Sequence, residues 1–73
     1  MSHNSADRLV KMANQIGKFF AAQRHSDAVA GTAEHLKKFW DPRMRAGIID
    51  HVAHGGSGLD EVPLQAVQKL AAK

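Results

Sequence analysis

Hydrophobic and polar residues follow a helical spacing in four stretches of the chain, separated by short polar links. In the first stretch, residues 6–23, apolar side chains recur every three or four positions: Leu9, Met12, Ala13, Ile16, Phe19 and Phe20. A helix turns about 100° per residue, so these side chains share one broad arc. Ser5 precedes them and is a candidate N-cap. We predict a helix over residues 6–23 after a flexible start at residues 1–5.

The second stretch, residues 27–40, repeats this spacing after a candidate cap at Ser26. Its apolar positions are Val29, Ala33, Leu36, Phe39 and Trp40. Glu34 and Lys38 lie four residues apart on the polar side, where opposite charges stabilise a helix by ~0.2–0.5 kcal/mol. We predict a second helix over residues 27–40.

Asp41-Pro42 interrupts the helical pattern and restarts it. Proline disfavours a helical residue before it, but suits the first helical position after an aspartate cap. The third helix is predicted over residues 42–53, with apolar positions at Met44, Ile48, Ile49 and Val52. The glycines that follow at 55, 56 and 58 suit the left-handed backbone that ends a helix. Gly47 inside this helix costs up to ~1 kcal/mol relative to alanine.

The fourth stretch, residues 60–72, starts with a candidate cap at Asp60 and has Pro63 in its first turn, where proline is tolerated. We expect this helix to bury Val62, Ala66, Val67 and Leu70. Links this short favour packing between consecutive helices. The sequence therefore predicts an all-α fold, a compact bundle of about four short helices that forms a single domain over residues 1–73.

The length and composition narrow the class of protein. The sequence has 73 residues and no cysteine, which excludes a disulfide-stapled scaffold. A chain this short buries only ~60% of the surface that its unfolded form exposes, so we expect support from a binding partner. The polar start of the chain has the pattern of neither a signal peptide nor a membrane span. We predict a cytoplasmic protein with no membrane interaction.

Positive charge is concentrated in residues 37–45. The net charge is +3, and Lys37, Lys38, Arg43 and Arg45 against Asp41 account for it. A small DNA-binding or regulatory helical module stays open as the alternative function. Arg43 and Arg45 would lie about 200° apart on one helix and could not both enter one groove. Nucleic acid is therefore the less favoured partner.

No arrangement of residues predicts catalysis or ligand binding. Ser5 and Ser26 are better explained as caps than as nucleophiles. His51 and His54 lie three residues apart on one helix and His35 could in principle join them, but no third ligand has the spacing of a metal motif. The glycines at 55–58 lie between two helices and are not followed by lysine, unlike a phosphate-binding loop. We predict no catalytic, cofactor-binding or metal-binding residue in this chain.

Two adjacent aromatic pairs, Phe19-Phe20 and Phe39-Trp40, suggest a binding surface. Neighbours on a helix diverge by about 100°, so one member of each pair lies centrally on the apolar arc and the other at its edge. We expect Phe20 and Trp40 in the core. The corner after Trp40 gathers residue types that are enriched in protein interfaces. The predicted partner interface consists of Phe19, Phe39, Trp40, Asp41, Pro42, Arg43, Met44 and Arg45.

A family resemblance rests on several short motifs in a fixed order. They are Met12-Ala13-Asn14-Gln15-Ile16-Gly17 followed by Phe19-Phe20, then Ala28-Val29-Ala30-Gly31, His35-Leu36, Phe39-Trp40-Asp41-Pro42-Arg43-Met44 and the turn at Gly55 to Leu59. From about Leu9 to Leu59, the chain resembles the delta subunit of the NAD-dependent, molybdenum-containing formate dehydrogenases. The ordered combination of these motifs is far more specific to the family than any single motif.

The resemblance implies a subunit of a soluble bacterial complex that oxidises formate to carbon dioxide and reduces NAD. In that family the alpha subunit holds bis-molybdopterin guanine dinucleotide and iron-sulfur clusters, and beta and gamma subunits hold FMN and further clusters. The delta subunit carries no redox centre and is linked to complex stability and to maturation of the molybdenum site. We therefore expect an accessory chain that is not an enzyme by itself. It would dock on the alpha subunit, either permanently or as a transient maturation factor.

Overall fold

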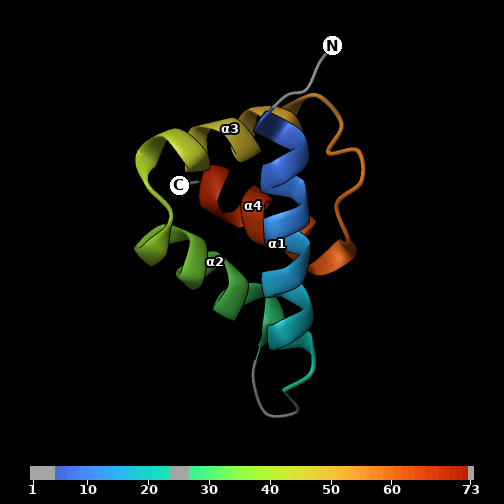
Figure 1. Ribbon diagram of the computed structural model, residues 1–73. Helices are drawn as coiled ribbons and strands as arrows, with labels where there is room; N and C mark the ends of the chain where they lie inside the picture. Colours follow the sequence, from blue (N-terminus) through green and yellow to red (C-terminus); the bar gives the residue numbers. More distant parts are fainter. Residues whose placement is uncertain (1–4, 24–26, 73) are drawn as a thin grey trace.

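The computed structural model describes residues 5–23 and 27–72, and these residues contain four α-helices (Figure 1). They are α1 (Ser5–Ala21), α2 (Ala28–Phe39), α3 (Pro42–Ala53) and α4 (Glu61–Ala71), and these residue ranges contain no strand. The radius of gyration is 11.3 Å, close to the value of about 11 Å expected for a compact domain of this length. The predicted all-α bundle is confirmed.

The bounds of α1 and the start of α2 differ slightly from the predicted ones. α1 includes Ser5, which we expected outside it as a cap, and ends at Ala21, two residues early. The candidate cap Ser26 lies outside the described residues. α2 is instead capped by Asp27, whose carboxylate accepts a hydrogen bond from the Ala30 amide at 3.1 Å. An aspartate in this position satisfies an amide that has no partner within the helix.

α3 has the predicted bounds at both ends. The Asp41 carboxylate accepts a hydrogen bond from the Met44 amide at 2.9 Å, and Pro42 occupies the first turn. At the other end Gly55 and Gly56 have positive φ angles of 116° and 65°, a backbone region that glycine enters without steric penalty. This conformation lets the Gly56 amide donate to the His51 carbonyl at 2.9 Å and ends the helix.

The start of α4 is held by α1, and not by its own cap. Asp60 occupies the N-cap position, but its side chain makes no capping hydrogen bond, so the predicted cap is wrong in mechanism. Instead the Asn14 side chain accepts from the Asp60 amide at 2.9 Å and donates to the Gly58 carbonyl at 3.0 Å. Asn14 on α1 therefore links α1 by two hydrogen bonds to the segment just before α4.

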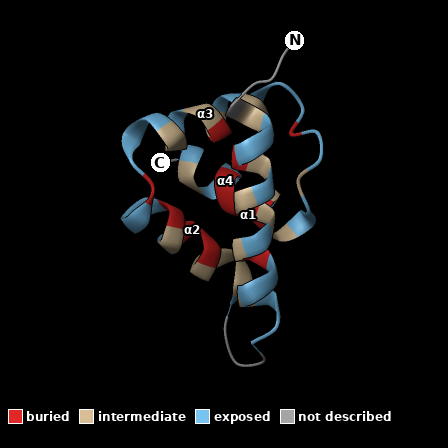
Figure 2. Ribbon diagram, in the orientation of Figure 1, coloured by how far each residue is buried: buried red, intermediate tan, exposed pale blue. Residues whose placement is uncertain are grey.

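α1 and α4 are the central helices of the bundle. Each contacts the other three, whereas α2 and α3 barely touch each other. Figure 2 shows the buried positions on the inward faces of all four helices, around α4. Every helix supplies at least one residue to the core cluster, and the corner after α2 adds a tryptophan: Leu9, Ala13, Leu36, Trp40, Ile48 and Val67.

Two glycines mark points where α1 and α3 meet a neighbouring helix closely. A Cβ atom added at Gly17 would lie 2.7 Å from Cδ of the buried Pro63 ring on α4. A Cβ atom at Gly47 on α3 would lie 2.8 Å from the Leu9 Cδ1 atom, at the end of a flexible side chain. The Pro63 ring is rigid, whereas the Leu9 side chain can rotate. A glycine is therefore needed more strictly at position 17, where α1 approaches α4, than at position 47.

We predict that Gly17→Ala lowers the free energy of unfolding by about 1–2 kcal/mol, because overpacking against a rigid ring outweighs the gain of up to ~1 kcal/mol in helix propensity. The matched control is Gly47→Ala, where the Leu9 side chain can turn aside and the propensity gain remains. Chemical denaturation of both variants measures the difference. A Gly17→Ala variant as stable as Gly47→Ala would contradict this packing requirement.

Candidate docking surface

The fold gives three of the predicted interface residues structural roles at the corner between α2 and α3. Trp40 is only 5% exposed and belongs to the core cluster, as expected from its central position on the apolar arc. Asp41 is the N-cap of α3, and Pro42 lies in its first turn. Their contact with a partner stays a prediction, and any such contact by Trp40 would involve little of its own surface.

Arg45 is engaged within the chain. Its Nη1 donates to the Lys37 carbonyl at 3.1 Å and also to the Trp40 carbonyl. The last carbonyls of a helix lack amide partners, so the guanidinium completes the end of α2 and ties it to α3. We expected Arg45 to pair with groups of another protein, but these two bonds already use part of its donor capacity.

Phe19 and Phe39 lie at the two ends of a row of four rings from α1 and α2. The ring centroids are 5.1 Å apart for Phe19–Phe20, 6.2 Å for Phe20–His35 and 4.8 Å for His35–Phe39. Phe19 is 61% exposed and Phe39 is 72% exposed. We call these four residues the aromatic row. Both phenylalanines, predicted at the edges of their apolar arcs, are exposed, and their contact with a partner stays a prediction.

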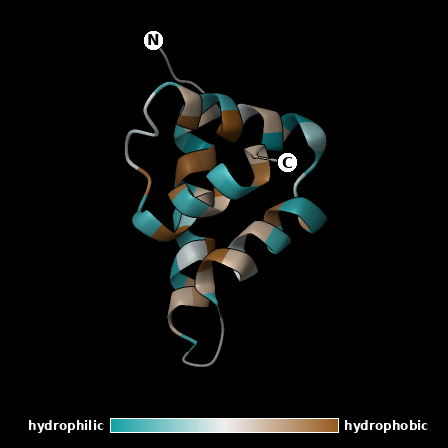
Figure 3. Cartoon of the chain, turned by 180° about the vertical axis from the view of Figure 1, so that it is seen from behind, coloured by the Kyte–Doolittle hydropathy of each residue, from teal (hydrophilic) through white to brown (hydrophobic). Residues whose placement is uncertain are grey.

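Close packing between α1 and α2 holds the aromatic row in place. Phe20 is half-buried, not fully buried as predicted, and its ring covers Gly31, where an added Cβ would lie 2.6 Å from Phe20 Cδ1. A shallow hollow opens beside it, lined by Gln15, Ile16, Phe19, Phe20 and His35. In Figure 3 the ribbon where α1 ends and α2 begins is mostly in pale hydrophobic colours, with hydrophilic positions between them. The two exposed rings of the row, Phe19 and Phe39, are therefore the large apolar side chains that this part of the molecule leaves open to solvent.

His35 is the member of the row that the sequence interpretation missed. The sequence suggests it as a third metal ligand and as part of the His35-Leu36 motif, but not as a member of an aromatic surface. The sequence could have predicted its contact with Phe39, because residues four apart are neighbours on a helix surface. Its contact with Phe20 crosses between two helices and has no local sequence pattern.

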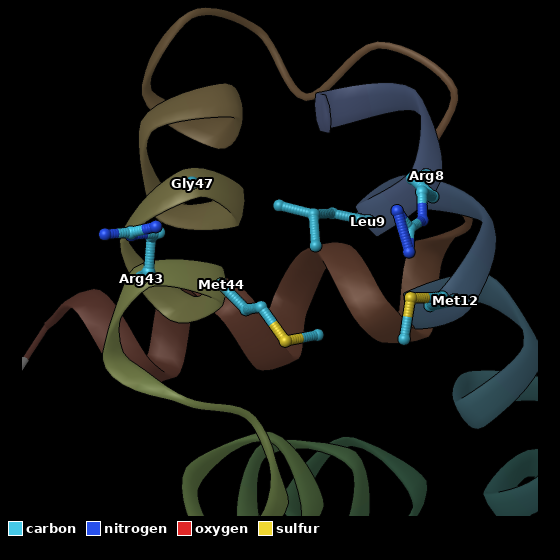
Figure 4. A pocket seen from close by; sticks show the side chains of 6 residues that line it. All are labelled: Arg8, Leu9, Met12, Arg43, Met44 and Gly47. Carbon is cyan, nitrogen blue, oxygen red and sulfur yellow. The ribbon is translucent and has the colours of Figure 1, made fainter. Parts of the chain in front are cut away.

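The last two predicted interface residues, Arg43 and Met44, lie at a second hollow between α1 and α3 (Figure 4). Its volume is about 430 Å³, and its lining consists of Arg8, Leu9, Met12, Arg43, Met44 and Gly47. Figure 4 shows the Leu9 and Met44 side chains pointing into the space between the two helices. The corner predicted as one surface is thus divided between the core, the end of α2, the aromatic row and this hollow.

The histidines weighed as metal ligands have separate partners. His51 Nε2 donates to the Ser57 carbonyl at 2.8 Å, and His54 Nδ1 donates to the Asp50 carbonyl at 2.9 Å. In residues 5–23 and 27–72, no three histidine or carboxylate side chains are grouped as a metal site. Nor does any helix in these ranges have the length and hydropathy needed to cross a bilayer.

Comparison with known proteins identifies one family. The family model described as NADH-dependant formate dehydrogenase delta subunit FdsD matches residues 8–67. The match covers all of the aromatic row and all of the residues that line the hollow between α1 and α3. Searches of curated proteins and of solved structures gave no significant match.

We predict that Arg45→Ala lowers the free energy of unfolding by about 1–2 kcal/mol, because two carbonyls at the end of α2 lose a charged donor. Arg43→Ala is the matched control, since Arg43 is exposed and makes no such bond, and a change within about 0.5 kcal/mol is expected there. Thermal unfolding followed by circular dichroism compares the two. Equal effects would show that the Arg45 bonds do not hold the corner.

Proposed function

The chain belongs to the family of NADH-dependent formate dehydrogenase delta subunits, and on this premise we propose that it docks on the alpha subunit through the aromatic row. Membership makes it a subunit of an NAD-dependent formate dehydrogenase, so its partners are other subunits of that complex. The observation that carries the proposal is the exposure of Phe19 and Phe39 at the two ends of one row of rings.

The energetics favour this row as the contact. Fully burying a phenylalanine side chain contributes roughly 1.5–3 kcal/mol, and two are available. Edge-to-face contact with Phe20 and tilted contact with His35 already restrain the two exposed rings. Restrained side chains lose less entropy on binding, and more of the burial energy then appears as affinity. Aromatic residues are also enriched at the centres of protein interfaces.

We propose further that the chain is an accessory subunit without a catalytic role of its own. The sequence contains no cysteine, the usual ligand of iron-sulfur clusters. We therefore assign bis-molybdopterin guanine dinucleotide, the iron-sulfur clusters, FMN and the NAD site to the alpha, beta and gamma subunits of a cytoplasmic complex. Docking of this chain would support the assembly or stability of the alpha subunit, or maturation of its cofactor.

DNA binding, the alternative that the basic segment 37–45 raised, loses support. The Arg45 guanidinium is bonded to carbonyls at the end of α2, so it is not presented with Arg43 as a pair of base-reading groups. The family of the chain is one of enzyme subunits, which does not favour a DNA-binding module.

We predict that Phe39→Ala weakens association with the tagged alpha subunit about 30-fold, since loss of an interface aromatic anchor typically costs about 2 kcal/mol or more. The fold of the free chain should be unchanged, because Phe39 is 72% exposed. Lys38→Ala is the matched control. Lys38 is the adjacent residue of α2, and among the described residues its ammonium pairs with Glu34 alone, at 3.2 Å.

Co-purification from cells that express all subunits measures the effect, and circular dichroism of each free chain checks folding. If Phe39→Ala and Phe19→Ala both co-purify like the unaltered chain, the aromatic row is not the docking surface. The stoichiometry of the purified active complex separates a permanent subunit from a transient maturation factor.

A further inference from the structure

The hollow between α1 and α3 has an apolar lining that no side chain of the described residues fills. Leu9, Met12 and Met44 form this lining, and the glycine at position 47 leaves the wall on α3 without a side chain. Methionine side chains are flexible and polarizable, and they adapt to the shape of what they contact. The hollow is therefore suited to an inserted apolar side chain.

Two arginines flank this apolar lining from opposite helices, Arg8 on α1 and Arg43 on α3. Both are exposed, and within the described residues neither takes part in the hydrogen bonds or ion pairs that join other side chains. The nearest acidic residues on α3 and its cap are engaged elsewhere: Asp41 accepts from the Met44 amide and Asp50 pairs with His54. Asp7 precedes Arg8 and points about 100° away from it around the helix.

We infer that this hollow binds a segment of a neighbouring subunit in which an apolar side chain is flanked by carboxylates. The apolar side chain would fill the space between Leu9 and Met44, and the carboxylates would pair with Arg8 and Arg43. Arginine forms two parallel hydrogen bonds with a carboxylate, which sets the orientation of the bound segment as well as its charge. The inference rests on the proposed function, because membership of a complex is what supplies the neighbouring segment.

Charge selects this occupant over a second copy of the chain. The chain carries a net charge of +3, so two copies repel each other, while an acidic segment is attracted from a distance. The basic hollow formed by Lys37, Arg45, Ile49, Lys69 and Leu70 is a weaker candidate. There the guanidinium of Arg45 is already bonded to two carbonyls, and lysine ammonium groups are more strongly hydrated than arginine.

The hollow is also separate from the aromatic row. It uses the first turns of α1 together with α3, whereas the row uses the last turn of α1 together with α2. A partner could contact both surfaces, but each has its own residues and its own chemistry. Variants in one surface can therefore be tested without changing the other.

The first experiment compares two variants that each remove two positive charges. Arg8→Gln/Arg43→Gln alters the hollow, and Lys37→Gln/Lys69→Gln alters the other basic hollow. Each full chain is co-expressed with the remaining subunits, and retention on the tagged complex is measured. The arginine variant should be retained about tenfold less than the lysine variant at about 0.1 M salt, and this difference should shrink at about 1 M salt, where charges are screened within about 3 Å.

Three contrary outcomes of this experiment can be told apart. Equal retention of the two variants, with Phe39→Ala still impaired, overturns the proposal for the hollow and leaves the docking function standing. Absence of the unaltered chain from the complex overturns the proposed function itself. A loss of retention that is insensitive to salt also overturns the proposal for the hollow, because the arginines would then not act through their charge.

A second experiment identifies what enters the hollow. The sequence has three methionines, and two of them, Met12 and Met44, line this space. Replacing methionine by its photoreactive diazirine analogue and irradiating the assembled complex should cross-link these two positions to a neighbouring subunit. Mass spectrometry should find a cross-linked peptide with an aspartate or glutamate beside an apolar residue. Cross-links to a second copy, to residues of the same chain only, or to a segment without acidic residues would overturn the proposal.

Discussion

The corner between α2 and α3 is the constraint on which the rest of the structure depends. These two helices barely contact each other, so their relative direction is set by the residues that join them and by the helices on either side. Asp41 caps α3, Arg45 completes the end of α2, and Trp40 enters the core between these two polar contacts. The chain turns sharply here and still satisfies the hydrogen bonds of both helix ends.

With that corner in place, α1 and α4 can each contact all the other helices. Gly17 allows α1 to approach the Pro63 ring of α4, and Asn14 bonds to the turn that starts α4. A chain of 73 residues can cover only a small core in this way. Apolar side chains that this core leaves uncovered lie in the aromatic row and around the hollow between α1 and α3, and the proposed docking on a larger subunit would bury both.

The sequence predicted which types of residue form the candidate site, but only partly which of those residues are free to contact a partner. The edge positions of Phe19 and Phe39 on their apolar arcs predicted exposure, because helix phase depends on local spacing alone. Asp41 and Arg45 also belong to the predicted interface, yet both make bonds that hold the corner together. Position in the sequence cannot distinguish an arginine that binds a partner from one that caps the preceding helix, because both lie at an exposed helix end.

The sequence by itself determined the four helices, their approximate bounds, the core position of Trp40 and the absence of a cysteine-based redox site. It also determined the family, since the ordered motifs agree with the match over residues 8–67. Only the tertiary structure decided that His35 joins Phe20 to Phe39, that Asn14 replaces the cap expected from Asp60, and that Arg8 shares a hollow with Arg43. Helix periodicity arises from contacts three or four residues apart, whereas most of these pairings join residues far apart in the chain and depend on how helices cross.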